Sequence, residues 1–297
     1  MIKRTLYFGN PAYLKTSNEQ LVIEMQDTGE TKTVPTEDIG LLILDHQQIT
    51  ITHALIAKLL EKNVAVITCD STHHPTGLLL NLDGHSLQSQ KFKAQLDATV
   101  PLKKQLWQQT IMCKINNQAA LLRKNNKKYE VLNTFSKEVK SGDSENHEAK
   151  AASYYWKNIF PDVIQFTRDR FGLPPNNFLN YGYAILRAVV ARSLVGSGLL
   201  PTMGIHHRNQ YNSYCLADDI MEPYRPYVDM LVCKMMNEDE PPFEINTEAK
   251  KLLLTLPAMD VYIEEQKSPL LNAVQKTTAS LAKCFEGKAR KITYPEL

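Results

Sequence analysis

The stretch Leu78-Leu79-Leu80-Asn81-Leu82-Asp83-Gly84-His85 marks the point where the chain changes from strand-like to helix-like sequence. Before it, short runs of alternating or β-branched residues are separated by turn residues, a pattern typical of strands. After it, apolar residues recur every three or four positions, which is typical of amphipathic helices. The sequence therefore predicts an α+β protein, with a small β-rich N-terminal domain followed by a larger all-α C-terminal domain.

The first 85 residues are expected to hold several short strands and one helix. Asp27-Thr28-Gly29-Glu30 supplies a hairpin turn between two strands. Thr52 is a candidate N-cap for a helix over residues 53–62, whose apolar side chains recur at helical spacing. The expected strands cover residues 4–8, 13–16, 20–25, 31–34, 39–44, 64–68 and 78–80.

The remainder of the chain divides into a linker over residues 86–100 and a helical domain over 101–297. Pro101 fits the first turn of a long helix that runs past Trp107 and Ile111 to Leu122. Further helices are expected over residues 129–139, 145–159, 178–199, 214–236 and 248–256, and from 260 or beyond to 286. We find no internal repeat and no low-complexity tract.

The composition is that of an ordinary globular protein that can bury a real core, with 43% hydrophobic and 22% charged residues. A net charge of +2 is too small to indicate nucleic acid by itself. The charge is unevenly distributed, because residues 101–150 hold ten lysines and arginines against five acids. This excess fits either a phosphate-facing surface or a solvated helix face.

The cysteines and the N-terminal residues indicate the cellular compartment of the protein. The five cysteines are odd in number, widely spaced and without a CxxC pair, which argues against a disulfide framework and for a reducing environment. The N-terminal residues lack the apolar run of a signal peptide, and no stretch approaches transmembrane length. We therefore expect a cytoplasmic protein with no membrane association.

Two segments near the middle of the chain gather metal-binding side chains. Gly204-Ile205-His206-His207 precedes a predicted helix on which Asp219 and Glu222, three residues apart, share a face. Glu148 lies on a second predicted helix. Carboxylate oxygens suit hard divalent cations, and an added imidazole suits manganese as well as magnesium. A site of this kind can activate a hydroxyl group against a phosphodiester.

Each of these residues also has an ordinary explanation. Asp219 and Glu222 at this spacing fit solvated surface acids, with Glu222 bonded to Arg225. Glu148 fits a helix N-terminal acid favoured by the macrodipole. Only one of the adjacent histidines is expected to point inward, because neighbours in an extended loop face opposite ways. A zinc site would use His206, His207, Cys215 and Cys233, but the sequence lacks a second local ligand pair.

The whole chain resembles the CRISPR-associated adaptation integrases, the metal-dependent Cas subunits that insert new spacers. The resemblance is carried by Asn180-Tyr181-Gly182-Tyr183-Ala184-Ile185-Leu186, by Gly198-Leu199-Leu200-Pro201 with Gly204-Ile205-His206-His207, and by residues 216–226. Leu106-Trp107-Gln108-Gln109 and Lys114-Ile115-Asn116-Asn117-Gln118 resemble the type II branch, whose systems also carry the Cas nine nuclease.

The resemblance implies metal ligands at Glu148, His207 and Glu222, with Asp219 close by in a supporting catalytic role. His206 is the alternative to His207, which is preferred because it ends the Gly-x-x-His pattern. A Mg²⁺ or Mn²⁺ ion would then support attack of a 3′-hydroxyl on a phosphodiester at the repeat boundary, by transesterification. The same site would cleave branched DNA. Substitution of His207 or Glu222 is expected to abolish strand transfer and leave the fold intact.

The resemblance also implies partners. These are protospacer and repeat DNA, a homodimer built by the β-rich domain of residues 1–85, and a second, smaller CRISPR adaptation subunit. Candidate phosphate contacts are Lys103, Lys104, Arg123, Lys124, Arg187 and Arg192. Two rival functions stay open from the residues alone: a nucleic-acid-binding scaffold without chemistry, and a metal-dependent nuclease outside CRISPR.

Overall fold

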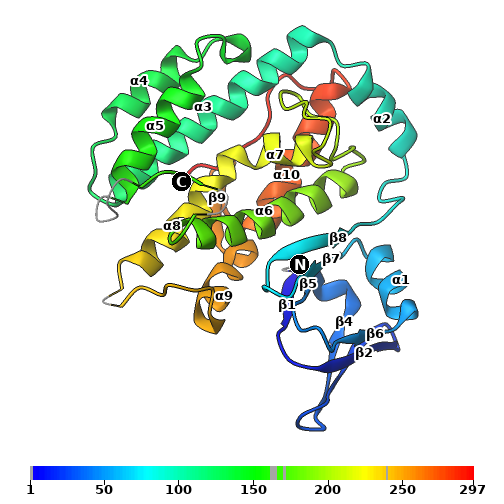
Figure 1. The fold of residues 1–297 in the computed structure, drawn as a ribbon. Helices are drawn as coiled ribbons and strands as arrows, with labels where there is room; N and C mark the ends of the chain where they lie inside the picture. The colour runs from blue at the N-terminus through cyan, green and yellow to red at the C-terminus, as the bar shows by residue number, and fades with distance from the viewer. Residues whose placement is uncertain (1–2, 161–165, 170–171, 239) are drawn as a thin grey trace.

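Two four-stranded sheets form the N-terminal part of the protein (Figure 1). The computed structural model describes residues 3–160, 166–169, 172–238 and 240–297. The first sheet has the order β1-β5-β7-β8, in which β1, β5 and β7 are parallel and β8 runs antiparallel. The second has the order β4-β3-β2-β6. The strands are β1 (Arg4–Phe8), β2 (Ala12–Ser17), β3 (Gln20–Met25), β4 (Thr31–Pro35), β5 (Ile39–Leu44), β6 (Thr50–Ile51), β7 (Ala65–Cys69) and β8 (Pro75–Leu79).

The sequence of β5 explains its central place in the first sheet. Its residues Ile-Gly-Leu-Leu-Ile-Leu are almost all buried, as expected of a parallel strand covered on both faces. Helix α1 (His53–Glu61) connects the sheets, and Thr52 caps it by accepting a hydrogen bond from the Leu55 N–H. Side chains from α1 and both sheets share one core, which includes Leu14, Leu21, Ile23, Leu42, Leu59 and Val66.

The rest of the described chain is mainly helical, which confirms the predicted fold class. Its helices are α2 (Gln88–Leu96), α3 (Val100–Lys124), α4 (Glu130–Glu138), α5 (His147–Ile159), α6 (Asn176–Gly196), α7 (Cys215–Met221), α8 (Arg225–Met236), α9 (Thr247–Leu253) and α10 (Leu270–Phe285). Short 3₁₀ turns lie at η1 (Thr36–Asp38), η2 (Ser141–Asp143), η3 (Glu222–Tyr224) and η4 (Leu256–Ala258).

Helix α3 organises the part of the fold that holds the candidate site. Thr99 accepts a hydrogen bond from the Leu102 N–H, and Pro101 occupies the first turn, as the sequence predicts. The helix packs against α4 and α5 and also against α7, η3 and α8 (Figure 1). Its buried face carries Trp107, Ile111, Ile115 and Leu122, so sequence-distant segments meet along one rigid element.

Three details of the helical part were not predicted. Residues 86–100, expected as a linker, contain helix α2, whose buried Gln95 donates hydrogen bonds to the Leu200 and Met203 carbonyls. The helix expected from residue 260 or beyond begins at Leu270, and it follows an unexpected hairpin of β9 (Asp260–Ile263) and β10 (Gln266–Pro269). Positive φ angles at Glu264 and Glu265 form its turn. The division into domains at residue 85 stays a prediction.

The third error concerns the expected helix over residues 214–236, which is interrupted between α7 and α8. Pro223 and Pro226 lack the N–H groups that a continuous helix would use. The chain therefore passes through the tight turn η3, in which the Arg225 N–H bonds to the Glu222 carbonyl. Glu222 thus begins a 3₁₀ turn, whereas Asp219 lies in α7.

Polar contacts join the β-rich part to the helical part. Arg192 on α6 is buried and its Nε donates to the Asn63 carbonyl at 2.5 Å. Lys250 on α9 reaches Asp45, just after β5, with an Nζ–Oδ2 distance of 2.6 Å. Among the described residues, none of the helices combines the length and apolar character needed to cross a bilayer.

Candidate functional site

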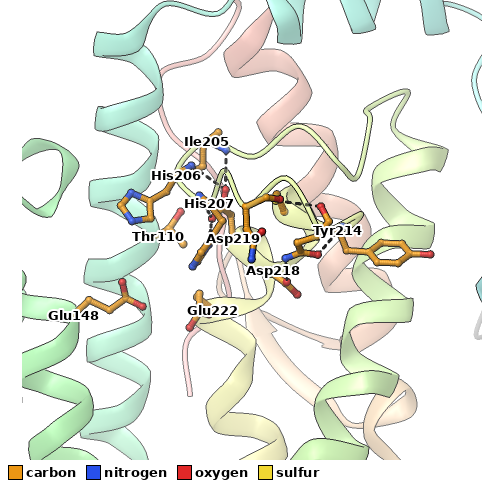
Figure 2. A network of polar contacts seen from close by, with 12 residues as sticks. Thr110, Glu148, Ile205, His206, His207, Tyr214, Asp218, Asp219 and Glu222 are labelled. Carbon is orange, nitrogen blue, oxygen red and sulfur yellow. Dashed lines mark hydrogen bonds and ion pairs between the residues drawn. The ribbon is translucent and has the colours of Figure 1, made fainter. Parts of the chain in front are cut away.

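Four segments meet beside α3 to form the candidate site. They are the first turn of α5, the loop over residues 204–207, the end of α7 and the turn η3. Figure 2 shows His207, Asp219 and Glu222 grouped together, with Glu148 set apart from them. The four predicted site residues are thus brought to one region by elements that lie far apart in the sequence.

Glu222 is buried between two cations. Only 4% of the residue is exposed. Its Oε1 accepts a hydrogen bond from Arg225 Nε at 2.8 Å, and its Oε2 forms an ion pair with Lys114 Nζ at 2.6 Å. Burial would raise the pKa of Glu222, but the charges of Arg225 and Lys114 outweigh it and lower this pKa to about 2. Glu222 is therefore ionised at neutral pH.

Lys114 joins Glu222 to Glu148. Its Nζ donates to Glu148 Oε1 at 2.7 Å, so one ammonium group contacts both carboxylates. Burial would lower the pKa of Lys114, but the charges of Glu222 and Glu148 raise it above its ordinary value. The lysine stays protonated and holds two acids from α5 and η3 within reach of a single cation.

The backbone before α5 fixes the position of Glu148. Asp143 accepts the N–H of His147 at 2.8 Å and the N–H of Glu148 at 2.9 Å, so it satisfies two orphan donors at the helix start. Asn146 adopts a left-handed conformation, and the helix begins at His147 instead of residue 145. His147 is buried and its Nε2 lies 3.2 Å from Glu138, which places it outside the site.

Asp219 binds the loop that carries the histidines. It is fully buried, and its Oδ2 accepts the N–H groups of Ile205 at 2.7 Å and His206 at 3.0 Å. Its Oδ1 accepts the N–H of His207 at 3.2 Å and contacts Nδ1 of the same residue at 2.5 Å. Each oxygen thus serves two donors, so Asp219 supports His207 from behind.

Gly204 is required by this close approach. A Cβ atom there would lie 2.4 Å from the His207 carbonyl oxygen and 2.8 Å from Asp219 Oδ2. Both distances are too short for a side chain to be accommodated without movement of the loop. The glycine of the Gly-x-x-His pattern therefore allows the loop to fold onto the carboxylate.

The two histidines have different surroundings. His206 is exposed and its ring stacks on Trp107, with centroids 4.1 Å apart. Burial lowers its pKa. The hydrogen bond to Asp219 raises the pKa of His207, and the charges of Glu222 and Glu148 act in the same direction. With Nδ1–H donated to Asp219, Nε2 of His207 carries the free lone pair that a metal ligand needs.

The side chains of the candidate site are of the types that bind a hard divalent cation. The carboxylates of Glu148 and Glu222 and the imidazole of His207 are suitable ligands. In the described part of the chain, however, no three His, Cys, Asp or Glu side chains stand close enough together to hold an ion. The Lys114 ammonium lies where the carboxylates converge.

Other sequence-based suggestions can be located as well. In the alternative zinc site, the Cys215 thiol points to the Asn209 and Asn212 carbonyls and Cys233 packs in the core. Among the candidate phosphate contacts, Arg192 is buried on the Asn63 carbonyl and Arg187 pairs with Asp218 at 2.7 Å. Arg192 is thus withdrawn from solvent, whereas the Arg187 side chain is 43% exposed and uses Nε for its ion pair.

The sequence analysis missed the role of Lys114. A signal was present, because Lys114 follows Ile111 by three residues and Trp107 by seven, on the apolar face of α3. A lysine at such a position has to find anions inside the fold. No comparable pattern in the sequence predicted the supporting contacts of Asp143 and Trp107.

Comparison with known proteins gives a consistent match. The family described as "CRISPR associated protein Cas1" matches residues 6–267. The chain is 36% identical over 300 residues to the CRISPR-associated endonuclease Cas1 of Neisseria meningitidis serogroup C (strain 8013), covering 100% of this chain and 97% of that protein.

Solved structures share the fold. A casposase bound to its integration product has a TM-score of 0.79 and 19% identity, covering 98% of this chain and 92% of that one. A Cas6-RT-Cas1–Cas2 complex has a TM-score of 0.75 and 20% identity, covering 99% of this chain and 36% of that one. At this level of identity, these two likenesses extend to the fold alone.

Proposed function

The chain belongs to the Cas1 family of CRISPR-associated proteins, and we propose that it is a metal-dependent DNA integrase and endonuclease of CRISPR adaptation. In this role it joins the 3′-hydroxyl ends of protospacer DNA to the boundaries of a CRISPR repeat by transesterification, and it cleaves branched DNA. The full-length similarity to a CRISPR-associated endonuclease supports the general activity. The metal, the transesterification and the site residues are parts of the proposal.

One observation carries the proposed chemistry. Glu148 and Glu222, 74 residues apart in sequence, direct carboxylate oxygens at the same ammonium group, at 2.7 and 2.6 Å. Two acids converge in this way on a position that holds a cation, the Lys114 ammonium. We assign Glu148, Glu222 and His207 Nε2 as the ligands of Mg²⁺ or Mn²⁺.

The ion, when bound, supplies Lewis-acid activation of a 3′-hydroxyl and stabilises negative charge on the attacked phosphodiester. The protein's own residues prepare that position. Asp219 keeps the His207 Nδ1 protonated and so directs the Nε2 lone pair outward. Arg225 holds Glu222 from the other side, through Nε at 2.8 Å. His207 is the preferred ligand over His206, because His206 stacks on Trp107.

The partners in this proposal are protospacer DNA, repeat DNA, a second copy of the chain and a smaller adaptation subunit of the Cas2 type. Structural relatives described as a casposase bound to integration product and as a Cas6-RT-Cas1–Cas2 complex support the nucleic acid and the Cas2-type partner. Exposed cations on α3 such as Lys104 and Lys124 remain candidates for phosphate contact. Homodimer formation through residues 1–85 stays a prediction.

A strand-transfer assay tests the function. The purified protein and its Cas2-type partner are incubated with a protospacer duplex, a leader–repeat duplex, and Mn²⁺, Mg²⁺ or EDTA. We expect joined product with either metal, none with EDTA, and none from a protospacer with 3′-dideoxy ends. Binding without turnover in every condition would indicate a scaffold instead. Hydrolysis without joined product would indicate a nuclease outside CRISPR adaptation.

A further inference from the structure

Lys114 has an unusual position for a lysine. It lies on the buried face of α3, with 8% of the residue exposed, and its ammonium contacts Glu148 Oε1 and Glu222 Oε2. A buried charge is costly unless anions surround it. Within the part of the chain that the structure describes, Lys114 forms ion pairs with the two carboxylates assigned above to the metal.

The carboxylates in turn need a cation. Two ionised acids directed at the same point repel each other, and the repulsion is strong where water is excluded. Arg225 contacts only the Oε1 side of Glu222. Lys114 neutralises the negative charge between Glu148 and Glu222, on the Oε2 side of Glu222.

We propose that Lys114 is a positioning residue that acts as a built-in counterion: its ammonium holds Glu148 and Glu222 together in the metal-free protein, and a divalent cation must displace it to bind. This inference rests on the proposed metal-dependent function and adds a competition between lysine and metal. Lys114 preserves a stable, assembled pair of acids before the ion arrives, at the expense of metal affinity.

The competition predicts the direction in which metal affinity changes when the lysine is removed. If one ammonium and one divalent ion use the same carboxylates, removal of the ammonium strengthens metal binding and weakens the metal-free fold. Two ligands coupled in this way usually change each other's affinity by about 5–150-fold. We expect Lys114→Met to bind Mn²⁺ on the order of tenfold more tightly than the wild type.

The experiment uses the full chain and MnCl₂ alone, without DNA. Mn²⁺ affinity is measured by calorimetric titration and by the electron paramagnetic resonance signal of free Mn²⁺, and thermal unfolding is followed in EDTA and in Mn²⁺. The variants are Lys114→Met, Lys114→Gln and Lys114→Arg. Lys276→Met is the control, because it removes another lysine that pairs with a glutamate, Glu264 at 3.0 Å, outside the site.

The expected pattern separates competition from a merely structural role. Lys114→Met and Lys114→Gln should unfold at a lower temperature in EDTA, bind Mn²⁺ more tightly and show a larger rise in melting temperature with Mn²⁺. Lys114→Arg and Lys276→Met should keep the wild-type affinity. If one of the neutral variants does not fold, the other provides the measurement.

Two results would overturn the inference, and they differ in their meaning. Unchanged or weaker Mn²⁺ binding by the neutral variants, with normal binding by the wild type, rejects the competition and leaves the proposed metal site intact. Absence of Mn²⁺ binding by every variant and by the wild type rejects the metal site itself, and the competition with it.

Discussion

His207 contacts Asp219 through both its ring and its main chain, with Nδ1 at 2.5 Å and N at 3.2 Å from the same carboxylate oxygen. The other oxygen of Asp219 binds the N–H groups of Ile205 and His206. A fully buried acid with four donors has no oxygen free for an exposed ligand. Its proposed role is therefore to orient His207 instead of binding the metal.

Asp219→Asn tests this role. The amide keeps one acceptor oxygen but presents an NH₂ group to some of the four donors, so the loop and the His207 tautomer are disturbed. We expect Mn²⁺ affinity and strand transfer to fall about 10–100-fold, as for other groups that orient a metal-binding histidine. Stability should fall by about 1–3 kcal/mol.

The matched control is Asp218→Asn. Asp218 is the neighbouring acid, but its partners are Arg187 Nε and Asn212 Nδ2, both at 2.7 Å, and not the histidine loop. It should keep the wild-type Mn²⁺ affinity. Equal loss of affinity in both variants would show that charge in this region, not the contact with His207, is what matters.

Glu222→Gln should lose both activity and stability. The sequence alone suggested that substitution of this residue would spare the fold, but Glu222 neutralises Lys114 and Arg225 in a buried position. Removal of one partner of a buried ion pair typically costs about 3–5 kcal/mol. Urea unfolding at neutral pH measures the loss, and strand transfer should be abolished in the folded fraction.

A double variant shows whether the Lys114 charge contributes to the stability that Glu222→Gln loses. Glu222→Gln leaves Lys114 with Glu148 in place of two acids, so adding Lys114→Met should recover part of the stability that Glu222→Gln loses. Additive losses in the double variant would mean that the two side chains do not act as a pair.

Local patterns in the sequence predicted most of the fold. The cap at Thr52, the hairpin at Gly29 and the proline at the start of α3 each depend on neighbouring residues, so each was correctly placed. The errors came from competing local signals. Apolar residues of helical spacing hid the effect of Pro223 and Pro226, and alternation in Val261 and Ile263 was too short to be separated from a helix.

The sequence singled out the candidate site residues but not the contacts that they make. The spacing of Asp219 and Glu222 indicated acids on one face, yet it did not show that Asp219 turns to the histidine loop while Glu222 turns to α3. The contact of Asp219 with the loop joins residues 12–14 apart in sequence, and the contact of Glu222 with Lys114 joins residues 108 apart, so both depend on how the chain folds back on itself. The role of Lys114 between the acids likewise depends on the packing of both α5 and η3 against α3, which no local pattern predicts.

Lys250→Met should weaken the contact between the helical part and the β-rich part. Asp45 is 1% exposed and is held by Lys250 Nζ at 2.6 Å, by His73 Nδ1 at 2.9 Å and by the Tyr7 hydroxyl. Without the lysine, a buried carboxylate loses its main cation, which typically costs about 3–5 kcal/mol. Chemical denaturation measures the loss, and hydrogen exchange should increase in α9 and β5.

The adjacent residue offers a matched control. Lys251 pairs with Glu248 at 2.7 Å, but both side chains are largely exposed. Lys251→Met should therefore change stability by less than about 0.5 kcal/mol. A loss of similar size in both variants would contradict the assignment of Lys250 as a stabilising contact between the two parts.

Asp229 should make stability depend on pH in an identifiable way. It is buried, and it accepts hydrogen bonds from the Tyr155 hydroxyl at 2.7 Å and the Tyr183 hydroxyl at 2.5 Å. Burial raises its pKa from 3.8 to about 6, although the two tyrosines and the charges of Arg225 and Arg168 oppose this shift. Between these values the folded protein binds a proton that the unfolded chain releases, so this contribution to stability decreases as pH rises.

Asp229→Asn removes this titration and isolates its effect. The free energy of unfolding of the variant, relative to the wild type, should increase from pH 4 to pH 6 by up to about 3 kcal/mol and then stay constant, since each pKa unit corresponds to about 1.4 kcal/mol. Urea denaturation at half-unit pH steps measures the difference, which cancels the titration of groups common to both proteins. A difference that does not vary with pH, or one that decreases, would mean that Asp229 is ionised throughout this range and that the tyrosines and arginines outweigh its burial.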